Sequence, residues 1–310
     1  MPPEILRLIL DRIREPHKPI AQQKTLAACA LVSRRWKPCA QSALWEQPLL
    51  CTAQRVHAFL ARHILETQHP SKQDSPHHFV RVLDLTAVRF AEPDDTQYLH
   101  AIGRSGVRLR TLKLFCDPLD PRTLAYILAT CRDVVELKIT GSSGGSQSRF
   151  FYHLPPVRLM DPSALTSLHT RLAHLRALDL GDLDLSRGDG AALAGIVGAS
   201  VGARLREFSM PMATRPAEGA LSWRDDALVA QVASQCPALT FFCARGRYIT
   251  DRALECLALN CQQLRLVDLS NCPGITATGV MALLEGEALR PSPPQNWDPT
   301  EAPSSVLHRP

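Results

Sequence analysis

The histidines and cysteines of this chain are the residue types from which a catalytic or metal centre could be built, but their spacing suits neither. His57, His63 and His69 recur every six residues, whereas two metal ligands on one helix face need a spacing of three or four. The ten cysteines include no C-x-x-C pair, and Cys39 and Cys51 lie near no obvious base that would activate a thiol. The sequence therefore predicts a protein that is not an enzyme and that holds no metal and no cofactor.

Polar and apolar side chains at fixed positions of a repeated pattern are better candidates, and the chemistry that they suggest is recognition. Seven segments read apolar-x-x-apolar-x-apolar, and they start at Val80, Leu109, Val134, Leu175, Leu205, Leu239 and Leu264. If the apolar positions of each strand point inward, the residues between them point outward. One outward row is then Asp84, Lys113, Lys138, Asp179, Ser209, Cys243 and Asp268, and a second is Val82, Thr111, Glu136, Ala177, Glu207, Phe241 and Leu266.

Within these rows, two groups are predicted to bind a substrate protein. Lys113 and Lys138 would form a small positive spot, and a less polar spot would lie near the C-terminal end. The members of that second spot and its charged neighbour are Phe241, Cys243, Leu266 and Asp268. The alternative is that the charged residues of the sheet only solvate its face and neutralise one another.

The elements that position these rows form a repeat. The steps between pattern starts are 29, 25, 41, 30, 34 and 25 residues, which is typical of stacked solenoid units. Helical stretches are expected between the strands, over residues 123–131, 164–174, 191–199, 226–236, 251–261 and 278–285. The prediction is an α/β solenoid with parallel strands on one face and helices on the other.

The 41-residue step contains an insertion over residues 142–160. It opens on a run of glycine and serine and continues into Phe150, Phe151 and Tyr152, which are large side chains of the kind enriched at interfaces. These three residues are predicted as further substrate-binding candidates. The alternative is that they fold back over the edge of the sheet or over a helix.

The N-terminal residues 1–48 are predicted to form a small helical unit. Ile5, Leu6, Ile9, Leu10 and Ile13 follow Pro2-Pro3 at helical spacing. Leu8 lies off the main face of Ile5, Ile9 and Ile13. Pro16 and Pro19 break the pattern, and further helices are expected over residues 25–36 and 40–46. A fourth, amphipathic helix over residues 53–66 precedes a polar connector at 68–76.

Bulk composition places the chain in a broad class. The 310 residues are 45% hydrophobic, yet they contain no apolar run of about 18 residues, the length that a membrane span needs. The start lacks the layout of a secretion signal, which predicts reduced thiols and a location in the cytoplasm or nucleus. Residues 1–67 hold 10 Lys+Arg and 5 Asp+Glu, whereas the remainder holds 25 of each. That balance predicts no broad basic stripe, and hence no nucleic-acid partner and no membrane partner.

The repeated units resemble leucine-rich repeats of the cysteine-containing type. Residues 261–276 carry the L-x-x-L-x-L-x-x-C signature with Val267 in place of one leucine, and residues 249–257 supply the I-T-D-x-x-L-x-x-L turn and helix of that class. Cys131, Cys236 and Cys261 each lie three residues before a strand pattern. The resemblance implies a horseshoe of about seven repeats whose inner face binds a partner.

Residues 2–48 resemble an F-box. The opening L-P-x-E-I-L-x-x-I-L is matched by residues 1–10, the signature L-V-C-x-x-W by residues 31–36 with Ser33 for cysteine, and the closing Leu-Trp by residues 44–45. The resemblance implies a docking surface for a Skp-family adaptor. The residues expected to contribute to it are Pro3, Glu4, Ile5, Leu8, Val32 and Trp36. The alternative for Ile5 and Trp36 is that they belong to the core of the unit.

Together these resemblances imply an F-box unit at 1–48, a linker helix and connector at 49–78, a leucine-rich-repeat domain at 79–285 and a disordered proline-rich tail at 286–310. Proteins of this organisation are non-catalytic substrate receptors of cullin–RING ubiquitin ligases. The adaptor links them to the cullin, and the repeats hold a substrate protein, which the sequence does not identify. The alternative is a repeat scaffold that sequesters a partner and carries a vestigial F-box.

Overall fold

The structure is a computed structural model of the whole chain, and it describes the placement of thirteen stretches of residues. They are residues 3–13, 19–67, 80–88, 108–115, 130–131, 133–140, 174–181, 184–185, 197, 199–210, 212–213, 223–246 and 248–288.

The N-terminal part is a helical unit of α1 (Pro3–Ile13), α2 (Pro19–Val32) and α3 (Trp36–Glu46). Its small core contains Leu10, Leu26, Ala40 and Ala43. Three predicted boundaries were wrong, because α2 begins at Pro19 and ends at Val32, and α3 begins at Trp36. Proline lacks the N–H that a first helical residue leaves unpaired, so Pro19 starts a helix instead of breaking one.

Local hydrogen bonds explain how α2 and α3 are arranged. The Ser33 hydroxyl accepts a hydrogen bond from the backbone N–H of Trp36 at 3.3 Å, and Ser33 O accepts one from Lys37 N at 3.1 Å. These bonds satisfy free N–H groups where α3 begins. At the other end, Gln23 Nε2 in α2 donates to the carbonyl of Gln47, just after α3, at 2.7 Å. The two helices therefore run antiparallel.

Helix α4 (Ala53–Thr67) confirms the predicted fourth helix and packs onto the sheet's core. Val56 is buried in the same cluster as the strands, and Phe59 packs against that cluster. The Trp45 ring of α3 stacks on the Phe59 ring with centroids 6.1 Å apart. In addition, Arg81 N, just before the first strand, donates to Glu46 O at 2.9 Å. The end of α3 is thus fixed to the beginning of the sheet.

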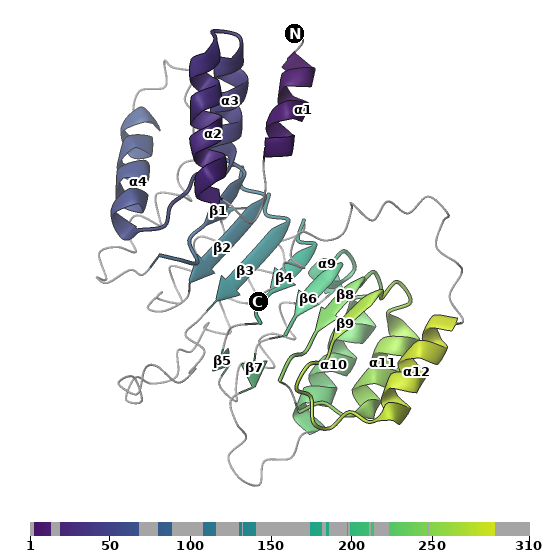
Figure 1. Cartoon of the computed structure of the whole chain (residues 1–310). Helices are drawn as coiled ribbons and strands as arrows, with labels where there is room; N and C mark the ends of the chain where they lie inside the picture. Colours follow the sequence, from purple (N-terminus) through teal and green to yellow (C-terminus); the bar gives the residue numbers. More distant parts are fainter. Residues whose placement is uncertain are drawn as a thin grey trace, which may run out of the picture.

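All seven predicted strand patterns form strands of one parallel sheet (Figure 1). The strands are β1 (Val82–Asp84), β2 (Thr111–Phe115), β3 (Glu136–Thr140), β4 (Ala177–Asp179), β6 (Glu207–Ser209), β8 (Phe241–Cys243) and β9 (Leu266–Asp268). Their order in the sheet is their order along the chain. A second, two-stranded parallel sheet of β5 (Asp184–Leu185) and β7 (Met212–Ala213) was not predicted.

Burial alternates along the strands as the apolar pattern predicts. The second residue of each of the first six strands is buried: Leu83, Leu112, Leu137, Leu178, Phe208 and Phe242. The equivalent Val267 of β9 is only partly buried. Both β1 and β9 end the sheet, but α4 adds Val56 and Phe59 to the core cluster that contains Leu83 of β1. The residues that alternate with the buried positions, such as Lys113 and Lys138, point to the opposite face of the sheet and are only partly buried. A partner protein could contact them there.

Helices α9 (Ala199–Gly202), α10 (Trp223–Gln235), α11 (Asp251–Asn260) and α12 (Ala277–Ala288) complete the described part. In Figure 1, α10, α11 and α12 stand together behind β6, β8 and β9. The predicted helices over 226–236, 251–261 and 278–285 are confirmed within a few residues, whereas those over 123–131, 164–174 and 191–199 lie mostly outside the described residues. The α/β class is confirmed, and the finer prediction of a leucine-rich-repeat horseshoe stays a prediction.

Neighbouring units in the C-terminal half are joined by the same polar contacts. The carboxylate of Asp226 accepts hydrogen bonds from Thr250 N at 2.7 Å and Thr250 Oγ1 at 2.5 Å. One unit later, Asp251 accepts from Thr276 N at 2.8 Å and Thr276 Oγ1 at 2.5 Å. The buried Cys261 thiol donates to Cys236 O at 3.5 Å. Each unit therefore fixes the start of the next helix through a carboxylate.

Candidate protein-binding surfaces

Helix α1 buries only part of its predicted apolar pattern. Leu6 and Leu10 are buried and Ile13 packs against the small core, whereas Ile5, Leu8 and Ile9 are 44%, 62% and 38% exposed. Leu8 lies off the main face as predicted, but Ile5 and Ile9 of that face are exposed, which was not expected. The three exposed residues are spaced i, i+3 and i+4, so they lie on one side of the helix.

The end of α2 adds to this exposed apolar surface. Leu31 is 88% exposed and Val32 is 66% exposed. In Figure 1, α1 begins at the same end of the unit at which the chain turns from α2 into α3, away from the sheet. We call Ile5, Leu8, Ile9, Leu31 and Val32 the distal surface. Both helices thus leave large apolar side chains in water, which makes these residues candidates for contact with a partner.

The other predicted adaptor contacts take different places. Pro3 is the first residue of α1, and Glu4 is exposed in the first turn of that helix. Trp36 is half-buried and packs against the core around Leu10. Trp36 therefore holds the unit together, as the alternative interpretation of this residue expected. Ile9 and Leu31 were missed as contact candidates, although Leu31 opens the second F-box-like signature.

On the sheet, both predicted outward rows are aligned in register. Asp84 is opposite Lys113, Lys113 is opposite Lys138, and the pairing continues through Asp179, Ser209, Cys243 and Asp268. The second row, from Val82 to Leu266, lies two residues earlier in each strand and pairs in the same way. The two rows therefore form continuous lines across seven strands.

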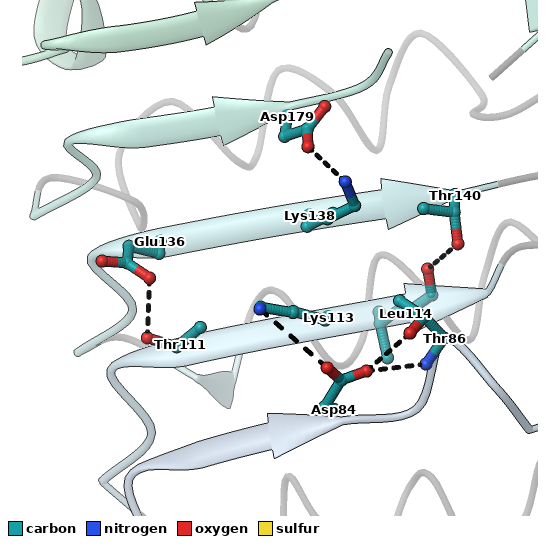
Figure 2. A network of polar contacts seen from close by, with 9 residues as sticks. All are labelled: Asp84, Thr86, Thr111, Lys113, Leu114, Glu136, Lys138, Thr140 and Asp179. Atoms are coloured by element: carbon teal, nitrogen blue, oxygen red, sulfur yellow. Dashed lines mark hydrogen bonds and ion pairs between the residues drawn. The ribbon is translucent and has the colours of Figure 1, made fainter. Parts of the chain in front are cut away.

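The two adjacent lysines of the first row are flanked by aspartates, so the predicted positive spot is neutralised. Figure 2 shows Lys138 Nζ 2.6 Å from Asp179 Oδ2, and Lys113 Nζ 3.9 Å from Asp84 Oδ2. Both pairs are partly exposed, with side-chain exposures between 29% and 36%. The two lysines are neighbours in register, but each has a carboxylate on its other side. The four residues from Asp84 to Asp179 therefore carry two positive and two negative charges. This part of the first row suits a polar contact with groups of both signs.

The aspartates of this row also hold the turns that follow their strands. Asp84 Oδ1 accepts hydrogen bonds from Thr86 N and Oγ1 (Figure 2), Asp179 Oδ1 accepts one from Gly181 N, and Asp268 Oδ1 accepts two from Ser270. The second oxygen of each carboxylate faces a cation, which for Asp268 is Arg245 at 2.6 Å. These carboxylates thus have structural partners on both oxygens.

The less polar spot is present at the C-terminal end of the sheet. Phe241 of β8 is opposite Leu266 of β9, and Cys243 is opposite Asp268. Leu266 is 43% exposed, and the other three are partly buried. Burial of Asp268 opposes ionisation, but the hydrogen bonds from Ser270 and Arg245 outweigh it and lower the pKa of this carboxyl. The other predicted candidates, Phe150, Phe151 and Tyr152, lie outside the described residues.

The thiols of the sheet region are poor nucleophiles. Burial raises the pKa of Cys131 to about 11 and that of Cys236 to about 12, and burial also raises the pKa of Cys243. A thiol reacts as the thiolate, so these groups are largely inert at neutral pH. Within the described part of the chain, no group of three His, Cys, Asp or Glu residues is placed to hold a metal ion. No helix in that part is long and apolar enough to cross a membrane.

Comparison with known proteins assigns no family to this chain. No protein-family model matches the chain, and no curated protein matches it. Among solved structures, a chain from the crystal structure of the Rad7 and Elc1 complex in yeast aligns with 92% of this chain and 73% of its own length. The TM-score is 0.35 and the sequence identity is 11%. A similarity at this level supports no statement about function.

Proposed function

We propose that this chain is a non-catalytic substrate-recognition subunit of an SCF-type ubiquitin ligase. In this proposal the helical unit is an F-box that binds a Skp-family adaptor, and through it a cullin–RING complex. The sheet is the inner face of a leucine-rich-repeat horseshoe that holds a substrate protein for ubiquitin-dependent degradation. The observation that carries the proposal is the distal surface, an exposed apolar group on a unit whose own core is small.

The size of the distal surface fits a docking role. Burying one exposed leucine, isoleucine or valine side chain contributes up to ~1.5–3 kcal/mol. Association costs at least ~4 kcal/mol in lost freedom of motion. One such side chain would not offset this cost, whereas the five of the distal surface together supply a gain on its scale. Leu8 and Leu31, the two leucines of this group, are 62% and 88% exposed and are expected to contribute most.

Attachment of the helical unit to the sheet also supports the proposal. Trp45 stacks on Phe59, and Arg81 N donates to Glu46 O, so the end of α3 is joined to the first strand. The distal surface lies at the opposite end of α3. An adaptor bound there would leave the outward rows of the sheet free for a substrate.

Purification of the tagged chain from cells treated with a proteasome inhibitor, followed by mass spectrometry, tests this function. The expected result is recovery of a Skp-family adaptor and a cullin with the wild type and with Leu259→Asp, a control at an exposed leucine of α11 (76% exposed). The variant Leu8→Asp, which changes no buried residue, is expected to lose both. Recovery of partners without any adaptor, from all three forms, would instead support a scaffold that acts by sequestration.

A further inference from the structure

Arginines gather along the edge of the sheet at which the strands begin. The residue immediately before each strand is, in order, Arg81, Arg110, Val135, Arg176, Arg206, Thr240 and Arg265. Because all seven strands are parallel (Figure 1), these positions line one edge. Backbone hydrogen bonds join consecutive members, for example Arg110 N to Arg81 O at 2.8 Å and Arg206 N to Arg176 O at 2.7 Å.

A second row widens this edge. Two residues earlier in four of the units are Arg108, Asp133, His174 and Arg204. We call Arg81, Arg108, Arg110, Arg176, Arg204, Arg206 and Arg265 the basic rim. All of its arginines are exposed except Arg81, which is partly buried. The count of charges along the chain did not reveal this row, because the parallel stacking sorts arginines from separate units onto one edge.

The fold itself does not require arginine at these positions. Val135 and Thr240 occupy the same position in their units and make the same backbone bonds, Val135 N to Arg110 O and Thr240 N to Arg206 O, both at 2.7 Å. Neighbouring strands are ~4.8 Å apart, so like charges on adjacent strands repel. Among the described residues, no ion pair involves Arg110, Arg176 or Arg206. An anionic ligand would offset this repulsion.

We propose that the basic rim binds an acidic segment of a partner protein. Arginine pairs with carboxylates in a bidentate geometry, which suits Asp and Glu side chains. Six steps between strands at ~4.8 Å give a rim of ~29 Å, which an extended peptide of about nine residues would span. Charge complementarity therefore selects an acidic peptide laid across the starts of the strands.

A nucleic acid fits this edge less well. Asp133 is exposed within the rim, and Glu136 and Glu207 begin the strands beside it. A continuous phosphate backbone would meet these carboxylates, whereas a peptide can place a neutral or basic side chain opposite them. The apolar Val135 also interrupts the row of arginines, between Arg110 and Arg176. The inference names the class of substrate, and in that respect it rests on the proposed function.

Fluorescence anisotropy with the purified chain and no adaptor tests the rim alone. The probe is a labelled peptide of about nine residues rich in Glu and Leu, and its Gln analogue is the control probe. The double variant Arg176→Glu, Arg206→Glu is expected to bind the acidic probe at least ~10-fold more weakly than the wild type. Binding to the wild type is expected to weaken as salt rises, because exposed charges are screened.

The matched control for this variant is Arg34→Glu, Arg252→Glu, which makes the same change in net charge at exposed positions. Arg34 lies in the turn between α2 and α3, at the end of the helical unit away from the sheet (Figure 1), and Arg252 lies in the first turn of α11. This control is expected to bind the acidic probe as the wild type does. If the charge-reversed rim variant does not fold, Arg176→Gln, Arg206→Gln replaces it, with an expected loss of several-fold. Capture of a Skp-family adaptor by the rim variant separates this inference from the proposed function, since it should be unchanged.

Three results would overturn the inference. One is an unchanged affinity of the rim variant for the acidic probe, and another is an equal loss in the matched control. The third is tighter binding of a single-stranded oligonucleotide than of the acidic peptide, lost on reversal of the rim, which would assign the rim to nucleic acid.

Discussion

Phe241 and Phe242 are adjacent in β8, yet we expect them to contribute very different amounts to stability. Phe242 points into the core with no exposed surface, and its ring lies 6.3 Å from that of Phe208, the residue opposite it on β6. Phe241 precedes it, points to the other face and is only half-buried. The variants Phe242→Ala and Phe241→Ala remove the same atoms from neighbouring positions. They therefore separate the contribution of the core from that of the open face.

The expected magnitudes differ several-fold. Truncation of a fully buried phenylalanine to alanine leaves a cavity and typically costs ~3–5 kcal/mol in the free energy of unfolding. Loss of the ring contact between Phe242 and Phe208 contributes ~0.5–1.5 kcal/mol to the effect of the change. Phe241→Ala leaves no internal cavity, and we expect a cost of about 1 kcal/mol or less. Since a domain is stable by only ~5–15 kcal/mol, the first change is severe and the second is mild.

Urea unfolding followed by circular dichroism measures both variants against the wild type. The expected result is a large drop in the unfolding midpoint for Phe242→Ala and a small one for Phe241→Ala, with similar slopes. Equal losses, or a larger loss for Phe241→Ala, would refute the placement of this strand. A shift of one residue in register would exchange the two faces and produce that reversed result.

Two further predictions concern ionisable groups. The hydroxyl and N–H of Thr276 lower the pKa of Asp251, so its contribution to stability is present above the unfolded value of ~3.9 and is lost as the pH falls below it. In an acid unfolding titration, the wild type should therefore lose more stability below about pH 4 than Asp251→Asn, and parallel curves would contradict this. Burial raises the pKa of Cys236 to about 12, whereas Cys51 is exposed. Iodoacetamide should thus label Cys51 of the native protein well before Cys236, which mass spectrometry can follow. Equal labelling rates would show that Cys236 is not enclosed in the core.

Much of the sheet could be predicted from the sequence, because each unit repeats the same local pattern. Leucine or a similar residue at positions one, four and six of the pattern fixes which side chains point inward. The outward rows follow from that alternation, and all six pairings between the seven strands were in the predicted register. The chain supplied seven repetitions of one signal, so errors in a single unit did not matter.

Other features depend on contacts between units, which local patterns do not contain. The positive spot at Lys113 and Lys138 was predicted from neighbouring strands, but the carboxylates that neutralise it are one strand further out on each side. The basic rim was missed because charges were counted along the chain and not by position in the repeat. An arginine directly before the strand in five of seven units was the available signal.

The helical unit shows a similar limit. Apolar residues of α1 outnumber those that its small core can accept, so spacing alone left open which of them face inward. Packing of α1 on α2 and α3 decides this, by burying Leu6 and Leu10 and leaving Ile5, Leu8 and Ile9 in solvent. Pro19 was interpreted as a break because its position in the helix, at the first residue, was not known.

Titration calorimetry of a purified Skp-family adaptor into the purified chain tests whether the helical unit binds this adaptor through the distal surface. Saturable binding is expected for the wild type and for Leu259→Asp. At least ~10-fold weaker binding is expected for Leu8→Asp, since loss of one buried leucine contact already costs ~1.5–3 kcal/mol and ~1.4 kcal/mol is tenfold in affinity. Absence of binding to the wild type, or equal affinities for Leu8→Asp and Leu259→Asp, would contradict this role of the distal surface.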